Sequence, residues 1–590
     1  MRTKHLLIAA AAIGLALPAI AQQVANQQPA PTAAPASPAA SPAPAPAANP
    51  AANQAAEEAL PEGGADQTAV EEVSGNNLQP PSPPLEYPSW ARRDPWNVGP
   101  LDPARAGLTG EAWGGANGQF LSTLMRRMQT PLASRWVHIA LRDALLAKLH
   151  APSNVNPVDW VGERAWLLLR MGEADAARML IAGVDTDRFT PKMNQVAVQS
   201  ALADADPSAL CPLEDGIRQD DPAVLRLVQA MCASLAGQAD QASAMIDQAR
   251  RSGHIGGVDL ALAEKVVGAG SGGRASTIEW DPVDSMTAWR FGLAAGTGMV
   301  APDRLINASP LQLRAFEARA PLLSAQQRLA PAQIAAGLGV FSSQTMTDLY
   351  SQIYDTTDPA DLPDSDSWQL REAVVGKDVD TRLAAIRKLL GTGKDGLQKE
   401  AARALVARAA SLVNPDSRLG KDAPELISAM LAGGYDQAAA RWISAAGRMD
   451  DADSDRCWAM LALGAPNVAD VPTSRITDFI KRDNSRDHVR SALLVGGLAG
   501  LGRISTDTAN SLNQRYGLGL GHVTSWTRVI DSAAARGQGG TVLVLTGTGF
   551  QTPSFDRIPA SHLFHSVAAL ERTGQGFTAR MIAAEALSRT

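Results

Sequence analysis

Apolar residues recur along the chain after about residue 130 at the three- and four-residue spacing of amphipathic helices. The clearest stripe runs over residues 136–149, with its charged residues on the opposite side and with Pro131 and Pro152 as its boundaries. Alternating apolar and polar positions, which mark half-buried strands, are scarce. The best strand candidate, TVLVL at 541–545, follows a glycine turn at a spacing that suits the second helix of a pair. The pattern therefore predicts an all-α fold.

Short polar signals predict where individual helices begin and end. Asp221 followed by Pro222 is typical of an N-cap and the first helical position. The next helix is expected to end at Arg250 and Arg251, with Gly253 behind them, because basic residues and a following glycine are typical of helix C-termini. These signals predict a helical pair in this region.

A short motif recurs between apolar helical segments. It reads GEADAA at 172–177, GQADQA at 237–242, GGYDQA at 433–438 and, more loosely, GQGFTA at 574–579. In each copy the first glycine would end one helix in the left-handed conformation, and the final alanine would allow close helix approach. In the first three copies the aspartate would cap the next helix. The predicted turn residues are Gly172, Asp175, Ala177, Gly237, Asp240, Ala242, Gly433, Asp436, Ala438, Gly574 and Ala579.

This motif resembles the turn inside tetratricopeptide-like repeats, which reads G-x-Y-D-x-A. The other signature positions of that family do not recur regularly in this chain, and the spacing of the copies is irregular. The resemblance implies a degenerate tetratricopeptide-like α-solenoid built from irregular helix-turn-helix repeats. Arrays of this family usually bind proteins or peptides, so the resemblance also implies a binding function. The alternative is a non-repetitive helical domain that uses glycine turns.

The N-terminus reads as an export signal followed by a linker. Arg2 and Lys4 precede a short apolar run, and small residues at 19–21 predict cleavage between Ala21 and Gln22. Twelve apolar residues are too few to span a bilayer, which needs about 20. Residues 22–88 are rich in alanine and proline and contain no basic residue, so they are expected to be disordered. We expect an exported protein, periplasmic if the organism has an outer membrane.

The remaining chain divides into two helical regions. The first covers residues 89–354 and the second residues 368–590, and the acidic, proline-containing stretch 355–367 separates them. No later apolar run reaches the length of a membrane span, so no integral membrane segment is expected in the mature chain.

Charge argues against nucleic acid as a partner. The net charge of the chain is −7, and residues 1–90 account for seven acidic and two basic side chains. The part after residue 90 therefore carries 51 basic and 53 acidic side chains and is almost neutral. Nucleic-acid binding depends on neutralising phosphates with an excess of basic residues.

Motifs for catalysis, cofactors and metals are missing from the sequence. The Ser-x-x-Lys, Gly-x-Ser-x-Gly and His-Glu-x-x-His patterns do not occur, and TGTGF at 546–550 lacks the third glycine of a dinucleotide site. Asp451, Asp453 and Asp455 imitate the start of a calcium loop, but Arg456 and Ala462 stand where Gly and Glu are required. We expect instead a solvated loop that caps a helix starting near Arg456. No catalytic residue, cofactor or metal ligand is predicted.

Two pairs of residues remain as candidates for a special role. Cys211 and Cys232 flank a 20-residue segment and could form a disulfide in an oxidising compartment, although two buried thiols would fit the sequence equally well. Tyr350 and Tyr354 lie one helical turn apart and could line a peptide groove, with core packing as the alternative.

These features together favour an exported, non-catalytic scaffold or adaptor that binds a protein or peptide of the cell envelope. The alternative is a module that binds peptidoglycan or assists a cell-wall enzyme. An enzyme with scattered carboxylates stays open, because groups that converge only in three dimensions are invisible in one sequence.

Overall fold

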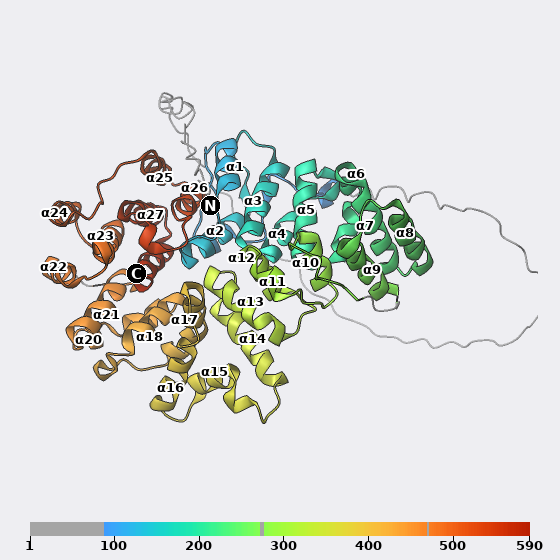
Figure 1. Ribbon diagram of the computed structural model, residues 1–590. Helices are drawn as coiled ribbons and strands as arrows, with labels where there is room; N and C mark the ends of the chain where they lie inside the picture. Colours follow the sequence, from blue (N-terminus) through green and yellow to red (C-terminus); the bar gives the residue numbers. More distant parts are fainter. Residues whose placement is uncertain (1–87, 272–276, 469–470) are drawn as a thin grey trace, which may run out of the picture. The chain divides into compact units, whose positions relative to one another are not determined.

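Helices make up almost all the regular structure in the computed structural model, which describes residues 88–271, 277–468 and 471–590 (Figure 1). Within these ranges the named strands are β1 (Asn97–Val98) and β2 (Leu149–His150), which form a two-residue antiparallel pair. The predicted all-α class is confirmed. The predicted signal peptide with Ala21 and Gln22, and the Ala/Pro-rich segment up to residue 87, lie outside the described residues.

The helices follow one another with short connections. Up to residue 356 they are α1 (Gly118–Arg127), α2 (Arg135–Leu146), α3 (Pro157–Met171), α4 (Ala174–Ile181), α5 (Pro191–Ala203), α6 (Glu214–Asp220), α7 (Pro222–Leu235), α8 (Ala239–Ser252), α9 (Gly257–Ser271), α10 (Ala288–Ala295), α11 (Asp303–Asn307), α12 (Leu311–Arg319), α13 (Ala325–Leu338) and α14 (Ser343–Thr356). After it they are α15 (Asp366–Val375), α16 (Val379–Leu390), α17 (Gly396–Ser411), α18 (Ala423–Ala432), α19 (Asp436–Ala440), α20 (Ile443–Ala446), α21 (Asp451–Gly464), α22 (Thr473–Arg482), α23 (Val489–Gly500), α24 (Thr506–Tyr516), α25 (Ser525–Ala535), α26 (Gly539–Gly549), α27 (Ala560–Arg572) and α28 (Gly576–Ser588).

Helix boundaries follow the local signals in most places. Asp221 caps α7 by accepting hydrogen bonds from the backbone N–H groups of Ala223 and Val224, and α8 ends at Gly253 with a positive φ. The segment 541–545 lies within α26 and is helical, as its spacing predicted. The stripe over 136–149 is different, because α2 ends at Leu146 and Leu149 belongs to β2.

The recurring glycine turns share one backbone geometry. A glycine with positive φ ends the first helix, and the next residue donates its N–H to the carbonyl five residues back, as Glu173 does to Leu168 at 2.9 Å. This is the Schellman arrangement, which glycine favours because it lacks a Cβ. Gly237 and Gly574 adopt it as predicted, and the turn at Gly537 repeats it without having been singled out. Three alanines of the motif, Ala177, Ala242 and Ala579, are fully buried, whereas Ala438 is half-buried.

Two details of the predicted turn differ in the structure. In the third copy the left-handed residue is Gly434, and Gly433 has an ordinary helical φ of −89° because it is the C-cap of α18. The aspartates are not N-caps. Asp175 and Asp240 lie in the first turn of α4 and α8, after cap residues that make no side-chain hydrogen bond. Asp436 begins α19 in the same way and forms an ion pair with Arg580 at 2.9 Å.

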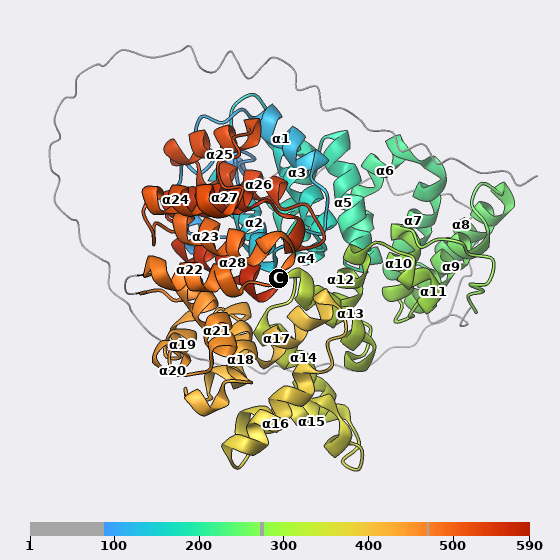
Figure 2. The same cartoon turned by 60° about the vertical axis from the view of Figure 1, so that its left-hand side comes forward.

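Helices from the two ends of the sequence pack against each other. Helix α2 contacts both α26 and α28, α28 contacts α18, α18 contacts α17, α17 contacts α13, and α13 returns to α2. The two views place the last helices beside the first ones (Figures 1 and 2). Residues on either side of the predicted boundary at 355–367 thus share one set of helix contacts. No helix of the described ranges is long and apolar enough to cross a membrane.

Candidate functional site

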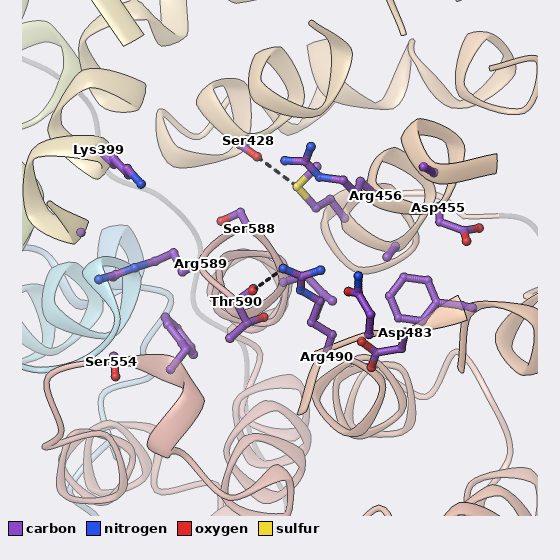
Figure 3. A pocket seen from close by; sticks show the side chains of 18 of the residues that line it. Lys399, Ser428, Asp455, Arg456, Asp483, Arg490, Ser554, Ser588, Arg589 and Thr590 are labelled. Atoms are coloured by element: carbon purple, nitrogen blue, oxygen red, sulfur yellow. Dashed lines mark hydrogen bonds between the residues drawn. The ribbon is translucent and has the colours of Figure 1, made fainter. Parts of the chain in front are cut away.

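A cavity of about 800 Å³ opens among helices of the C-terminal half. Its walls come from α17, α18, α21, α22 and α23, and the last turn of α28 with the residues after it projects into it (Figure 3). The lining residues are Gly396, Lys399, Glu400, Arg403, Ser428, Asp451, Ala452, Asp455, Arg456, Ala459, Met460, Phe479, Arg482, Asp483, Asn484, Arg490, Pro553, Ser554, Phe555, Leu587, Ser588, Arg589 and Thr590. The volume lies within the range of about 300–1,000 Å³ that is usual for ligand pockets.

Helix α21 brings Asp455 to the cavity wall. The side chain of Asp450 accepts a hydrogen bond from the backbone N–H of Asp453, so the helix begins at Asp451. The expected solvated loop before Arg456 is therefore wrong, because Asp450, six residues before Arg456, caps the helix. Asp455 is almost buried, and its carboxylate binds the Arg482 guanidinium through two hydrogen bonds of 2.6 and 2.8 Å. This contact raises the pKa of Arg482 and ties α22 to α21.

The Asp483 side chain stabilises the N-terminal turn of α23 by accepting hydrogen bonds. Its two carboxylate oxygens accept hydrogen bonds from the backbone N–H groups of Ser485 and Ser491, each at 2.9 Å, and from the Ser491 hydroxyl at 2.6 Å. Burial alone would raise the pKa of Asp483, but these hydrogen bonds outweigh it and hold the pKa below its usual value. The resulting turn places Arg490 at the cavity.

Two of the cations in the lining are fully engaged. Arg403 binds Glu400 at 2.6 Å and Glu425 at 3.0 Å, and it also donates to the backbone carbonyl of Ser588 at 3.1 Å. Arg589 binds Glu585 at 2.8 Å, and its guanidinium lies 5.5 Å from the centre of the Phe555 ring. These pairs fix the end of α28 against α17 and leave few free donors.

Three other cations are much less engaged. Arg490 makes one side-chain hydrogen bond, from Nη2 to the carbonyl oxygen of Thr590 at 2.6 Å. Arg456 reaches Glu425 only at 3.4 Å. Among the described residues the Lys399 ammonium has no hydrogen-bond or ion-pair partner. Figure 3 shows these three side chains coming from different walls of the cavity.

Apolar side chains form the remaining surface. Met460, Phe479, Phe555 and Leu587 line the cavity, and the first three are buried. Counting the charged side chains of the lining gives six basic residues and four acidic residues. The arrangement can therefore hold a ligand that combines apolar groups with negatively charged oxygens.

The residues predicted from sequence lie elsewhere. The turn residues shape helix junctions and do not line the cavity. Tyr350 is buried in the core, and Tyr354 stacks on Trp368 with 6.3 Å between ring centres. Cys211 and Cys232 are joined by a disulfide with their Cα atoms 5.7 Å apart. Within the described ranges no group of three or more potential ligands is placed to hold a metal ion.

Sequence reasoning did not predict the cavity, because Lys399 and Arg490 lie in no short motif and Asp451, Asp455 and Arg456 were noted only as an incomplete calcium loop. Lys399, Arg456 and Arg490 come from three helices, separated by 57 and 34 residues in the sequence. Each helix could be predicted from its own pattern, but their mutual packing could not. Comparison with known protein families, with curated proteins and with solved structures finds no match to this chain.

Proposed function

We propose that this protein is an exported, non-catalytic scaffold or adaptor that binds a segment of another envelope protein in the cavity between α17, α21, α23 and α28. The single observation that carries the proposal is the mixed lining of this cavity, in which basic side chains with few hydrogen-bond partners lie next to apolar side chains. Such a lining suits a chain segment better than a small neutral molecule, because it offers both apolar contact and charge.

The chemistry of the acidic side chains supports a binding role. Glu400 and Asp455 are held by arginines, and Asp483 caps α23. A general acid or base must be within reach of a substrate proton and able to exchange its own. Asp455 and Asp483 instead hold neighbouring helix ends together, and Glu400 pairs with Arg403 on its own helix and lies 4.0 Å from Arg589. Export is supported by the pattern of residues 1–21, and it would place the cavity in the cell envelope.

Photo-crosslinking in cells tests the proposal. The full-length exported protein carries p-benzoylphenylalanine in place of Lys399, which is an exposed residue of the lining. The matched control carries it in place of Arg218, an exposed residue outside the lining. After irradiation the envelope is digested to release wall-bound species, and adducts are identified by mass spectrometry.

We expect one protein to crosslink from position 399 in a saturable manner and not from position 218. The same protein should be lost when Arg490→Gln is added to the chain with the crosslinker at 399. Adducts that contain only peptidoglycan fragments would replace the proposal with the cell-wall alternative. Equal adducts from both positions, or none from position 399, would contradict it.

A further inference from the structure

The cavity has hydrogen-bond donors that the protein itself does not use. Among the described residues, the Arg490 side chain donates only through Nη2, to the main-chain oxygen of Thr590. Its position at the cavity is set by the Asp483 cap of α23, so the guanidinium is held on a rigid element. An arginine with free N–H groups at a partly enclosed surface is a strong site for a carboxylate, which it can bind through two parallel hydrogen bonds.

Main-chain oxygens of the protein's own residues 588–590 are bound by arginines of the cavity. Residues 588–590 follow the last turn of α28 into it, and arginines from two walls hold their backbone oxygens. Arg403 donates to the carbonyl of Ser588 at 3.1 Å, and Arg490 donates to the carbonyl of Thr590 at 2.6 Å. The geometry is therefore suited to oxygen acceptors on a peptide chain.

The acidic residues of the lining limit the kind of anion that fits. Asp451 is exposed at the edge of the cavity, and Asp455 lies in its wall. A compact polyanion such as a polyphosphate would be repelled by the exposed Asp451 carboxylate, whereas the charge of Asp455 is already paired with Arg482. A peptide can place separate carboxylates against Lys399 and Arg490 and apolar side chains against Met460 and its neighbours.

We infer that the cavity recognises an acidic peptide segment, with carboxylate side chains bound at Lys399, Arg456 and Arg490 and intervening apolar side chains against the apolar wall. This inference rests on the proposed function and specifies its ligand. Three charged contacts at a partly enclosed surface give a preference for glutamate over glutamine that also decreases with salt.

The experiment uses two pools of acetylated, amidated hexapeptides. One pool is X-Glu-X-X-Glu-X, with Ala, Val, Leu or Phe at each X, and the other has Gln in place of each Glu. Both pools are applied together to the immobilised full-length protein, and bound peptides are quantified by mass spectrometry. The variants are Arg490→Gln and Lys399→Gln, and the control is Arg486→Gln, because Arg486 is 95 % exposed and lies outside the lining.

We expect the Glu pool to be enriched at least fivefold over the Gln pool, with less than twofold enrichment on either cavity variant and unchanged enrichment on the control. The enrichment should also decrease when sodium chloride is raised from 50 to 500 mM. Within the part of the chain that the structure describes, the Lys399 ammonium has no partner whose loss could unfold the protein, so its variant remains informative if Arg490→Gln is unstable.

Equal binding of the two pools, no binding of either, or loss of enrichment on the control variant would overturn the inference. Displacement of the Glu pool by 10 mM inorganic phosphate would also overturn it, because the site would then be a general anion site. Failure here with retained crosslinking at position 399 would reject the acidic peptide but leave the proposed function intact. Loss of crosslinking would reject the function itself.

Discussion

The carboxylate of Glu585 on α28 accepts a hydrogen bond of 2.8 Å from the backbone N–H of Arg135 at the start of α2. It also accepts hydrogen bonds from the backbone N–H of Trp136 at 3.2 Å and from the hydroxyl of Ser134 at 2.5 Å. The first N–H groups of a helix have no partner inside that helix, and a negative charge there is favourable. A side chain from near the end of the chain thus completes the N-terminus of a helix 450 residues earlier.

Replacing Glu585 should therefore destabilise the whole helical unit. Glu585→Ala removes several hydrogen bonds from a buried carboxylate and leaves Arg589 without its closest ion-pair partner, so we expect a loss of about 2–4 kcal/mol in the free energy of unfolding. Glu585→Gln should cost less, because an amide oxygen can still accept. Urea denaturation followed by circular dichroism measures both.

The matched control for this prediction is Glu111→Ala, since Glu111 is exposed and has no ion pair in the described structure. It should change the free energy of unfolding by less than about 0.5 kcal/mol. A loss of equal size in both variants would mean that the contact between α28 and α2 adds nothing to stability.

Features of the fold could be predicted from the sequence where the interacting residues are close in the sequence, and could not where they are far apart. Helix α7 was predictable because Asp221 caps N–H groups two and three residues away. The surroundings of the start of α2 were not. The Arg135 guanidinium donates to the carbonyls of Ala336, Phe341 and Ala432, and the Arg135 backbone N–H donates to the Glu585 carboxylate. Local sequence patterns predict which helices form. They do not predict which helix ends pack against each other, and the cavity is formed by contacts between helices that are distant in the sequence.

The paired glycines of the third turn illustrate the same limit. Either Gly433 or Gly434 could supply the left-handed residue when the sequence is considered alone. The structure uses Gly434 for this, with φ of +81°, and needs Gly433 for a different reason. A Cβ on Gly433 would lie 2.3 Å from the Cβ of Ala407, so α17 fixes the assignment from outside the motif.

Alanine substitutions separate these two roles. Gly237→Ala should cost about 1 kcal/mol, because the residue has φ of +81° and no atom lies within 4 Å of the added Cβ. Gly433→Ala should cost more, because it forces α17 and α18 apart or strains the backbone. The comparison uses midpoints of urea denaturation at equal slopes. A smaller cost for Gly433→Ala would show that the contact with Ala407 yields easily.

The disulfide gives a prediction that needs no substitution. With Cys211 and Cys232 bonded and Cys457 free but buried, unfolded protein should release one thiol before reduction and three after it. Burial raises the pKa of Cys457 to about 12, so the assay requires denaturant. Closing a loop of this length should add about 3 kcal/mol to stability in the chain-entropy description. Three thiols before reduction would contradict the bond.

Stability should also depend on pH through Asp204, at the end of α5. Its side chain is 6 % exposed and lies 3.7 Å from Arg178. Burial raises the pKa of Asp204 to about 7, and the neighbouring Asp175 carboxylate adds to the effect. The folded protein therefore holds this proton more tightly than the unfolded chain, whose pKa is about 4. Stability from this group is present below pH 4 and is lost as the pH rises to about 7.

Asp204→Asn should then stabilise the protein at pH 8 by about 1–3 kcal/mol and have little effect near pH 4, because the amide stays neutral throughout. Asp206 provides a control of opposite sign. Burial alone would raise the pKa of Asp206, but hydrogen bonds from Ser208 and Arg178 lower it on balance, so its stabilising effect is present at neutral pH and lost as the pH falls. Asp206→Asn should therefore destabilise the protein at pH 8. Urea denaturation of both variants at pH 4 and pH 8 compares them, and a change of the same sign at pH 8 would refute the assignment of the raised pKa to Asp204.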